Sequence, residues 1–462
     1  MKSRIPVIPS SAAIQEAIRK IELSSGAAAF IVNDQGEFVG QVSIQQLRRM
    51  ILSGADSSSR LAPYLAFTAI KIDRAKIDDK KMLAAIAQDM EMQNIHDGAV
   101  VNKKNKVVGA LSLKEIRKII SDIRVKEPPA RTLPTENVLI VGGAGYLGSV
   151  LVRKLLQTER FVRVLDSFIY GKKSLQALEG HKNLEIIEGD FRNIETVVNS
   201  LKDIDAVVLL AAVVGDPAAH LRPEQTIETN ILAAQSLAFA CKLHCISRFI
   251  FASTCSVYGR TDDVLDENAP LNPVSLYARS KIFSEKSIFE LAGDNFSPTI
   301  LRMGTLYGYS PRMRFDLVVN TMSLKAHLEK RIQVFGGNQW RPLLHVEDAA
   351  AAFLGCLDAP LEKIGNQIFN VGSNEQNYQI LEIAELIGAV LKKVKIEVED
   401  AQLDARDYRV SFDKIHRKLS FKPQQTIPAA AKKIVRELSL GNLKNPFAKV
   451  YYNHYFDATE ES

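Results

Sequence analysis

The sequence predicts an α/β protein in which a doubly wound parallel sheet with a small C-terminal lobe follows a smaller α+β region. Three observations indicate this architecture. From residue 138 onward, short apolar runs alternate with stretches of helical periodicity, as in a parallel sheet covered by helices. A glycine-rich stretch separates the first of these runs from the first helix. Ahead of it, two similar segments occur near the N-terminus.

The composition is that of an ordinary globular protein and excludes some classes of partner. A net charge of +6 is too small and too dispersed to predict nucleic-acid binding. No apolar run approaches the ~20 residues that span a bilayer. The first residues lack a signal-peptide pattern, so we expect a cytoplasmic protein with no membrane partner. The four cysteines suggest reduced thiols. Cys241, His244 and Cys245 lack a second ligand pair at zinc spacing, so no metal site is expected.

Two N-terminal segments, 26–51 and 97–120, follow one pattern. Each contains an apolar strand, a polar turn, a second apolar strand, a serine and an amphipathic helix. Each also follows a helical stretch, at 12–23 and 81–93 respectively. A repeat of this kind predicts two copies of one supersecondary unit that pack together.

These residues resemble a pair of cystathionine-β-synthase (CBS) domains, and the resemblance covers residues 1–123. Such pairs often bind adenine nucleotides, whose ribose is held by a serine or threonine followed three residues later by an aspartate. The two copies carry Ser43 with Gln46 and Ser112 with Glu115, so the aspartate is missing from both. The resemblance leaves two roles open, an adenine-nucleotide site and a purely structural or dimerising unit.

A stretch with three prolines, 125–137, separates the two regions. Proline cannot continue a helix or pair at the centre of a sheet, so we expect a semi-rigid linker at 124–136. The main domain is then expected over 137–440. Residues 441–462 are rich in aromatic side chains and are expected to form a tail that docks on this domain.

Within the main domain, strands and helices are expected to alternate. The expected strands are 138–141, 162–165, 184–187, 206–210 and 249–252, and the expected helices include 149–157 and 226–243. From about residue 309 the alternation ends, which favours a smaller lobe that covers a substrate.

A glycine pattern, Gly142-Gly-Ala-Gly145-Tyr-Leu-Gly148, leaves the first strand and enters the first helix. The first glycine permits a tight turn, Gly145 lets the main chain approach a pyrophosphate, and Gly148 lets the helix pack closely on the strand. Asp166 ends the next strand, where a carboxylate binds adenosine ribose hydroxyls and repels a 2′-phosphate. The pattern predicts NAD rather than NADP, and the lysine pair at 172–173 is the contrary hint.

Hydroxyl groups and a lysine follow a later strand. The strand at 249–252 runs into Ser253 and Thr254, whereas Tyr277 and Lys281 lie four residues apart on one face of a predicted helix. A nearby ammonium and the positive nicotinamide ring both stabilise a phenolate. The pKa of Tyr277 is therefore expected to lie closer to neutrality, so that the side chain can take a proton from a substrate hydroxyl.

Residues 138 to about 435 resemble the extended short-chain dehydrogenases, in particular the NAD-dependent nucleotide-sugar epimerases and dehydratases. The resemblance rests on the glycine turn, Asp166, Leu210-Ala-Ala212 and the segments 253–259, 277–281 and 340–348. It implies a Rossmann fold with NAD bound by Gly142, Gly145, Tyr146, Leu147, Gly148, Asp166, Asp190, Phe191, Ala211, Ala212, Tyr277 and Lys281.

The same resemblance assigns the chemistry. Tyr277 is the acid and base, Lys281 is its activator and a ribose ligand, and Thr254 bonds the reacting oxygen. The implied substrate contacts are Thr254, Thr305, Arg314, Asn320, Arg341 and Arg406. Among these, Arg341 matches the arginine that grips a substrate diphosphate. Arg406 is expected to be the second such arginine, with Arg409 left open.

The sequence favours a nucleotide-sugar 4-epimerase that acts through a transient 4-keto sugar. Dehydratases carry an Asp-Glu pair after the catalytic threonine, where this chain has Cys255-Ser256, which argues against water elimination. A nucleotide-sugar oxidoreductase and a non-catalytic sensor of NAD and adenylate stay open as alternatives. The resemblance also implies a homodimer through helix 226–243 and the helix that carries Tyr277, or a tetramer if the CBS pair adds a contact.

Overall fold

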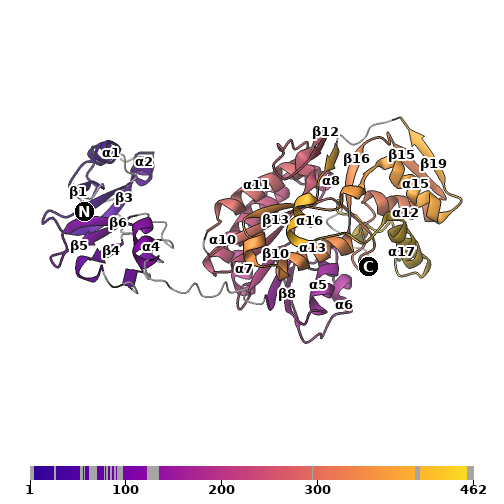
Figure 1. Ribbon diagram of the computed structural model, residues 1–462, viewed down its shortest axis with the longest axis horizontal. Coiled ribbons are helices and arrows are strands. Elements are labelled where there is room, and N and C mark those ends of the chain that lie inside the picture. The colour runs from indigo at the N-terminus through magenta and orange to yellow at the C-terminus, as the bar shows by residue number, and fades with distance from the viewer. Residues whose placement is uncertain are drawn as a thin grey trace. The chain divides into compact units, whose positions relative to one another are not determined.

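The structure is a computed structural model of the 462-residue chain. It describes residues 5–24, 28–52, 56, 58–61, 70–77, 79, 82–83, 86–87, 90, 97–121, 135–293, 295–400 and 406–454. The chain divides into two compact units, residues 1–131 and 132–462 (Figure 1). No helix among the described residues is long and apolar enough to cross a membrane.

The N-terminal unit contains two copies of one small motif. The first copy consists of β1 (Val7–Pro9), α1 (Ile14–Leu23), β2 (Ala28–Val32), β3 (Phe38–Ser43) and α2 (Ile44–Leu52). The second contains β4 (Lys71–Asp73), the 3₁₀ helix η2 (Arg74–Lys76), β5 (Asp97–Val101), β6 (Val107–Ser112) and α4 (Leu113–Ser121). In both, a parallel strand pairs with the first strand of an antiparallel hairpin. The predicted repeat is therefore confirmed.

The two copies share a small apolar core. Phe30 and Phe38 from the first copy cluster with Ala99 and Val101 from the second. The main-chain N–H of Phe38 also donates to the oxygen of Asn105 at 2.8 Å. These contacts make one packed unit of the repeat. The predicted helix at 81–93 and the predicted linker at 124–136 lie largely outside the described residues.

The larger unit is built on a seven-stranded sheet in the order β17-β13-β11-β10-β7-β8-β9, and every neighbouring pair is parallel. Its strands are β7 (Asn137–Val141), β8 (Phe161–Asp166), β9 (Leu184–Glu188), β10 (Ala206–Leu209), β11 (Arg248–Thr254), β13 (Ser297–Met303) and β17 (Gln367–Val371). The order reverses beside β7, and a crevice at such a switch point is the usual ligand site of a doubly wound sheet.

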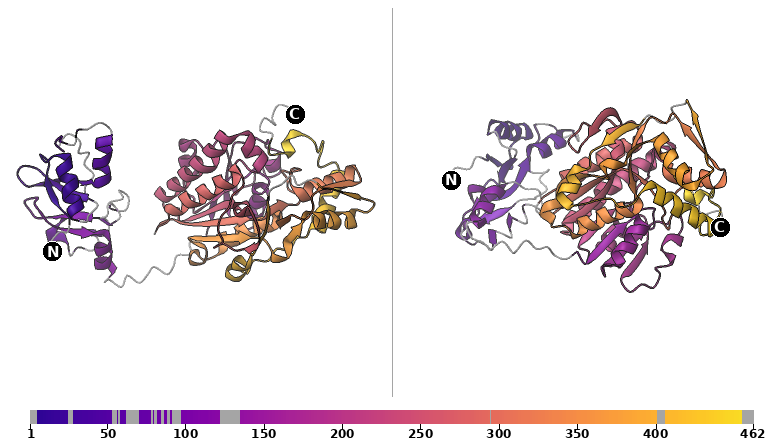
Figure 2. Two further views of the ribbon diagram at one scale, coloured as in Figure 1. Left: turned by 90° about the horizontal axis from the view of Figure 1, so that it is seen from above. Right: turned by 45° about the vertical axis from the view of Figure 1, so that its right-hand side comes forward.

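Helices cover both faces of this sheet (Figures 1 and 2). Val138 and Ile140 of β7 pack into one core, whereas Leu139 and Val141 pack into the other, as the two-residue period of a strand requires. The helices are α5 (Gly148–Leu156), α6 (Lys173–Gln176), α7 (Ile194–Ser200), α8 (Asp216–Leu221), α10 (Ala234–Leu243), α11 (Leu276–Glu290), α13 (Val346–Asp358), α14 (Leu361–Ile364) and α16 (Asp413–Leu419).

The predicted single helix at 226–243 is wrong in its details. The chain forms α9 (Pro223–Thr226), then a π-helix, η3 (Ile227–Ala233), and only then α10. Within η3 the Asn230 side chain is buried and bonds both main-chain groups of Val213 and the hydroxyl of Ser280. This tertiary anchor accompanies the wider turn, and a π-helical segment often marks a functional site. Apolar periodicity carries no signal for it.

The C-terminal lobe has its own apolar core. It is built from α12 (Val318–Leu328), β15 (Arg331–Phe335), α15 (Ile380–Leu391), β19 (Lys395–Glu399) and α17 (Ile427–Ser439). Smaller elements join it to the sheet domain: β12 (Arg260–Leu265), β14 (Thr305–Tyr307), β16 (Trp340–His345), β18 (Asn377–Gln379), β20 (Asp407–Val410) and the 3₁₀ helices η4 (Cys255–Tyr258) and η5 (Asn374–Gln376).

The C-terminal tail packs onto this unit through the 3₁₀ helix η6 (Lys449–Tyr451). The N–H of Phe315 donates to the oxygen of Tyr451 at 2.9 Å, and the two rings meet edge to face at 5.5 Å. The chain then runs on to Asn453, which lines the cavities described below. The last predicted aromatic residues, Tyr455 and Phe456, lie outside the described residues.

Candidate active site

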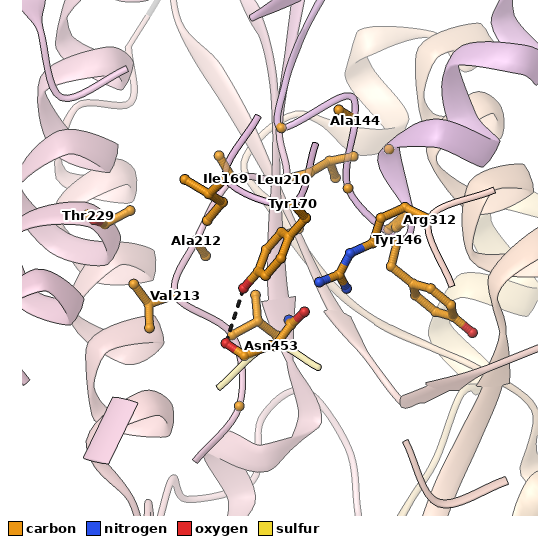
Figure 3. Close-up of a pocket in the computed structure, with 18 of the residues that line it drawn as sticks. Ala144, Tyr146, Ile169, Tyr170, Leu210, Ala212, Val213, Thr229, Arg312 and Asn453 are labelled. Atoms are coloured by element: carbon orange, nitrogen blue, oxygen red, sulfur yellow. Dashed lines mark hydrogen bonds between the residues drawn. The ribbon is translucent and has the colours of Figure 1, made fainter. Parts of the chain in front are cut away.

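A deep cavity opens where β7, β8, β10 and β11 end (Figure 3). Every residue that the sequence predicts to bind the cofactor lines it. The structure therefore brings the glycine turn, Asp166 and the Tyr277 helix together. Whether each of these residues contacts a cofactor stays a prediction.

The glycine turn is shaped by close main-chain contacts. Gly142 has a φ of 90°, and a Cβ on Gly148 would lie 2.2 Å from the main-chain oxygen of Gly142. Neither position accepts a side chain without a shift of the main chain. A Cβ on Gly145 would meet only one atom within 4 Å, the same oxygen at 3.3 Å. Gly145 therefore leaves room beside the turn for a phosphate group.

Asp166 ties the end of β8 to the glycine turn. Its carboxylate accepts hydrogen bonds of 2.8 Å from the N–H groups of Ala144 and Phe168. Burial raises the pKa of Asp166, and these two bonds oppose that rise. The contrary hint for NADP is weakened because the Lys172 ammonium pairs with Glu188.

The second half of the cavity holds the predicted catalytic group. Thr254 ends β11, and Tyr277 and Lys281 lie one turn apart on α11, which is capped by the side chain of Ser275. All three predicted catalytic residues line the cavity and are buried. The Lys281 ammonium donates to the main-chain oxygen of Ala252 at 2.9 Å.

The electrostatics of Tyr277 differ from the sequence prediction. Burial raises the pKa of Tyr277 well above its ordinary value and nearby Asp216 raises it further, whereas Arg314 and a hydrogen bond with Thr254 lower it. Burial also lowers the pKa of Lys281 to about 7, opposed by Glu285. The groups of the chain alone therefore raise the pKa of Tyr277, because desolvation outweighs Arg314 and the hydrogen bond with Thr254. The predicted shift toward neutrality also depends on the charge of a bound nicotinamide and stays a prediction.

A second cavity adjoins the first and contains arginines. Thr305, Arg314 and Arg406 line both cavities, whereas Arg341 lines only the second. Arg409 lines neither; it donates to the oxygen of Asp262 and its guanidinium lies 5.2 Å from the centre of the Trp340 ring. The alternative of Arg409 as the second arginine is therefore not supported.

The arginines differ in how their charges are met. Arg314 forms a bidentate pair with Asp316, with both bonds at 2.9 Å. The guanidinium of Arg406 lies 3.5 Å from the carboxylate of Asp216. The guanidinium of Arg341 donates to the main-chain oxygens of Trp340, at 2.7 Å, and Arg406, at 2.5 Å.

Comparison with known proteins identifies the larger unit. The model of the NAD dependent epimerase/dehydratase family matches residues 138–372, half of the chain, and the CBS domain model matches residues 1–53. The chain belongs to the NAD-dependent epimerase/dehydratase family. The predictions of an NAD-dependent fold and of an N-terminal CBS domain are thus confirmed.

Relatives of this family member carry several activities in their names. An uncharacterized UDP-glucose epimerase of Bacillus subtilis is 32% identical over 263 residues, which are 54% of this chain and 80% of the relative. UDP-glucuronic acid decarboxylase 1 of Danio rerio is 26% identical over 350 residues, 72% of this chain and 81% of the relative. The structure of MoeE5 in complex with UDP-glucuronic acid and NAD is 25% identical, with a TM-score of 0.58, and covers 66% of this chain and 99% of its own.

The cavity fits the cofactor of the family. Gly145 leaves space for a phosphate, and Asp166 stands at the end of β8. The buried guanidinium of Arg312 lines the same space, and two of its nitrogens have no partner among the described residues. Arg312 begins a segment, 312–320, that the sequence predicts to touch the sugar or its phosphates. Sequence reasoning missed Tyr170 and Asn453, which also line the cavity and which carry no motif.

The predicted role of Asn320 needs correction. Its side chain is fully buried and lines neither cavity. Its oxygen accepts from the N–H of Gly308, and its nitrogen donates to the Tyr146 hydroxyl and to the oxygen of Arg314. Asn320 therefore positions cavity residues and leaves no group for a substrate.

The paired residues of the CBS region cap helices. Ser43 exchanges hydrogen bonds with Gln46 at the start of α2, and Ser112 does the same with Glu115 at the start of α4. This is the geometry of a capping box, which explains the spacing without a ligand. An adenine nucleotide at this pair stays a prediction.

Proposed function

We propose that the chain is a 4-epimerase of nucleotide-diphosphate sugars. The observation that carries the proposal is the meeting of Thr254, Tyr277 and Lys281 in one cavity, with an arginine-lined cavity beside them. The first cavity suits a dinucleotide, and the second suits the diphosphate of a sugar nucleotide. Thr305, Arg314 and Arg406 stand where the two spaces join.

The residues of the chain supply positioning and proton transfer. Tyr277 takes the proton of the C4 hydroxyl and later returns one to the 4-keto sugar, while Thr254 bonds the reacting oxygen. Bound NAD supplies the chemistry of accepting a hydride from C4 and returning it. Between the two hydride transfers the 4-keto sugar rotates within the site, so that the hydride returns to its other face and the configuration at C4 is inverted. Because Tyr277 and Lys281 are buried, the site also limits access of water to them.

The arginines favour an anionic substrate. Guanidinium groups bind diphosphates through charge-assisted, bidentate hydrogen bonds. Arg341 and Arg406 lie at the second cavity and are joined by the hydrogen bond from Arg341 to the Arg406 oxygen. The names of the relatives make uridine-diphosphate sugars the first substrates to test.

A nucleotide-sugar oxidoreductase is the second candidate, because the same tyrosine and NAD would oxidise a sugar hydroxyl if NADH were released. A dehydratase is disfavoured because Cys255 and Ser256 replace the acidic pair. Cys255 is buried, burial raises its pKa well above the ordinary thiol value, and it donates to the oxygen of Arg302. A non-catalytic sensor would bind NAD and turn over no sugar.

One experiment separates these candidates. The full-length protein is incubated with UDP-glucose, UDP-N-acetylglucosamine and UDP-glucuronic acid, products are resolved by NMR, and NADH is followed by absorbance. An epimerase gives the C4 epimer with no net NADH, because the cofactor is restored in each turnover. Stoichiometric NADH, loss of carbon dioxide or absence of any product would each refute the proposal.

A further inference from the structure

Two buried polar side chains face the cofactor cavity with unpaired atoms. Nε and Nη2 of Arg312 and Oδ1 of Asn453 have no hydrogen-bond partner among the residues that the structure describes. The two residues are only 5% and 7% exposed, and both line the first cavity. A buried charge or acceptor without a partner is costly, so such atoms point to a ligand that pairs with them.

Arg312 is held by stacking and not by a carboxylate. The carbon of its guanidinium lies 3.8 Å from the centre of the Tyr170 ring, so its edge stays free (Figure 3). The neighbouring Arg314 takes both oxygens of Asp316. Burial and repulsion from Arg314 together lower the pKa of Arg312 to about 10. Within the described part of the chain, Arg314 therefore has a carboxylate hydrogen-bonded to it, whereas Nε and Nη2 of Arg312 have no partner.

Asn453 belongs to the C-terminal tail and is fixed by its main chain. Its main-chain N–H donates to the Asp316 carboxylate, and its main-chain oxygen accepts from the Tyr170 hydroxyl, both at 3.1 Å. These are the residues that pair with Arg314 and stack on Arg312. The main-chain bonds hold the tail in place and leave the side-chain oxygen available as an acceptor in the cavity.

We propose that Arg312 binds the diphosphate of the dinucleotide and that Asn453 accepts a hydrogen bond from a ribose hydroxyl beside it. A diphosphate supplies the acceptors that Arg312 lacks, and a ribose supplies the donor that Asn453 lacks. The position fits, because Arg312 is close enough to Asp166 and Tyr146 to lower the pKa of both. Tyr146 lies in the glycine turn, and Asp166 accepts a hydrogen bond from the Ala144 N–H of that turn. A substrate diphosphate is a poorer match, because Arg312 lines only the first cavity.

This inference rests on NAD binding in the proposed function, and its test measures binding and not activity. Full-length wild type, Arg312→Gln, Arg312→Lys and Asn453→Ala are freed of nucleotide and titrated calorimetrically with NAD, NADP, ADP and adenosine. Arg409→Gln is the matched control, because this arginine also stacks on an aromatic ring but lines neither cavity.

The Kd of Arg312→Gln for NAD and ADP should rise about 10- to 100-fold, as the loss of charge-assisted hydrogen bonds predicts, with adenosine binding unchanged. Arg312→Lys should restore part of the affinity. Asn453→Ala should weaken NAD binding by roughly 3- to 10-fold, with little change in melting temperature because the main-chain bonds remain. Arg409→Gln should bind NAD as wild type does.

Three outcomes would overturn the inference. If the Kd of Arg312→Gln for NAD lies within twofold of the wild-type value, Arg312 does not contact the diphosphate. A loss confined to NADP places Arg312 at a 2′-phosphate instead. Equal losses for ADP and adenosine, in both the Gln and the Lys variants, show a structural role. A wild-type protein that binds no NAD would instead refute the proposed function, so the two failures are distinguishable.

Discussion

The buried ammonium of Lys281 donates a 2.9 Å hydrogen bond to the main-chain oxygen of Ala252, two residues before Thr254 on β11. The ammonium also lies 4.6 Å from the centre of the Phe251 ring. The bond joins α11 to β11, so the positions of Lys281 and Thr254 are coupled. The bond also holds the Lys281 ammonium in a buried position, where loss of hydration destabilises its charged form.

That penalty makes the effect of Lys281 on stability depend on pH. Burial lowers its pKa to about 7 in the folded protein, against an ordinary value of 10.5. Between these values the unfolded chain binds a proton that the folded chain does not, so the contribution of Lys281 to the unfolding free energy rises with pH. Lys281→Met should therefore raise the free energy of unfolding at pH 6 by an amount on the order of 1 kcal/mol or more, and with it the melting temperature. This gain should shrink toward pH 9.

The measurement is calorimetric melting of nucleotide-free protein across that pH range. Lys286→Met is the matched control, because Lys286 is exposed on the same helix. The control should show no such trend. A gain for Lys281→Met that is constant with pH would contradict the assignment of the buried charge.

Removal of one hydroxyl tests the catalytic role of Tyr277. Tyr277→Phe should fold and bind NAD, because the ring stays in its buried place, and should lose turnover by ~10²–10⁴-fold, the usual contribution of an acid–base group. Turnover is measured at saturating sugar nucleotide, with melting temperature and NAD content as checks on folding. Tyr378→Phe, on β18 and outside both cavities, should have nearly normal turnover. Turnover of Tyr277→Phe near that of wild type would end the assignment.

Local signals in the sequence predicted the sheet and the cofactor cavity well. The glycine turn, Asp166 and the Tyr277–Lys281 spacing each depend on residues close together along the chain, and the parallel sheet brings its strand ends to one edge. That is why these residues meet in one cavity.

Long-range contacts set what the sequence did not reveal. The sequence predicts that Asn320 contacts the substrate, yet its side-chain amide is hydrogen-bonded to Tyr146, Gly308 and Arg314. The π-helix η3 depends on the contact of Asn230 with Val213. The pKa of Tyr277 is raised because burial outweighs charge, and burial is a property of the packed fold.

A buried ion pair between α11 and β13 should dominate the stability of this part of the fold. Arg302 and Glu285 form a 2.7 Å pair with side chains only 4% exposed, and Glu285 also accepts from the Ser253 hydroxyl. Glu285→Ala leaves the guanidinium buried without its carboxylate, which should cost about 3–5 kcal/mol of unfolding free energy. Replacement of both residues by methionine should recover most of that loss. Urea unfolding measures each variant, and a cost below about 1 kcal/mol for Glu285→Ala would contradict the argument.

An exposed apolar surface on η3, α10 and α11 should form a homodimer interface. Leu232, Phe239 and Phe283 are each half exposed or more, at 54%, 50% and 58%. Large apolar groups clustered on a surface mark association sites. Phe239→Glu with Phe283→Glu should therefore convert a dimer into a monomer, as followed by sedimentation velocity at micromolar concentration. Leu328→Glu, exposed in the separate C-terminal lobe, should stay dimeric. Wild type that sediments as a monomer would contradict the proposal.

Arg341 provides the sharpest test of the substrate site. It is 4% exposed on β16 and lines the second cavity, and its guanidinium bonds the oxygens of Trp340 and Arg406. Two carboxylates close to Arg341 along the chain would be the internal partners of a structural arginine, and both have other partners. Glu347 pairs with Lys154, and Asp348 accepts from the N–H groups of residues 424 and 425.

If Arg341 binds the substrate diphosphate, Arg341→Ala should raise KM by about 10- to 100-fold, because a charge-assisted contact is lost. NAD affinity should stay unchanged, since Arg341 does not line the first cavity. The melting temperature should fall only slightly. Two main-chain oxygens lose the guanidinium as a hydrogen-bond donor, but water that enters the cavity can donate in its place. A structural arginine would give the opposite pattern, with a large fall in melting temperature and an unaltered KM, and that pattern would remove Arg341 from the substrate site.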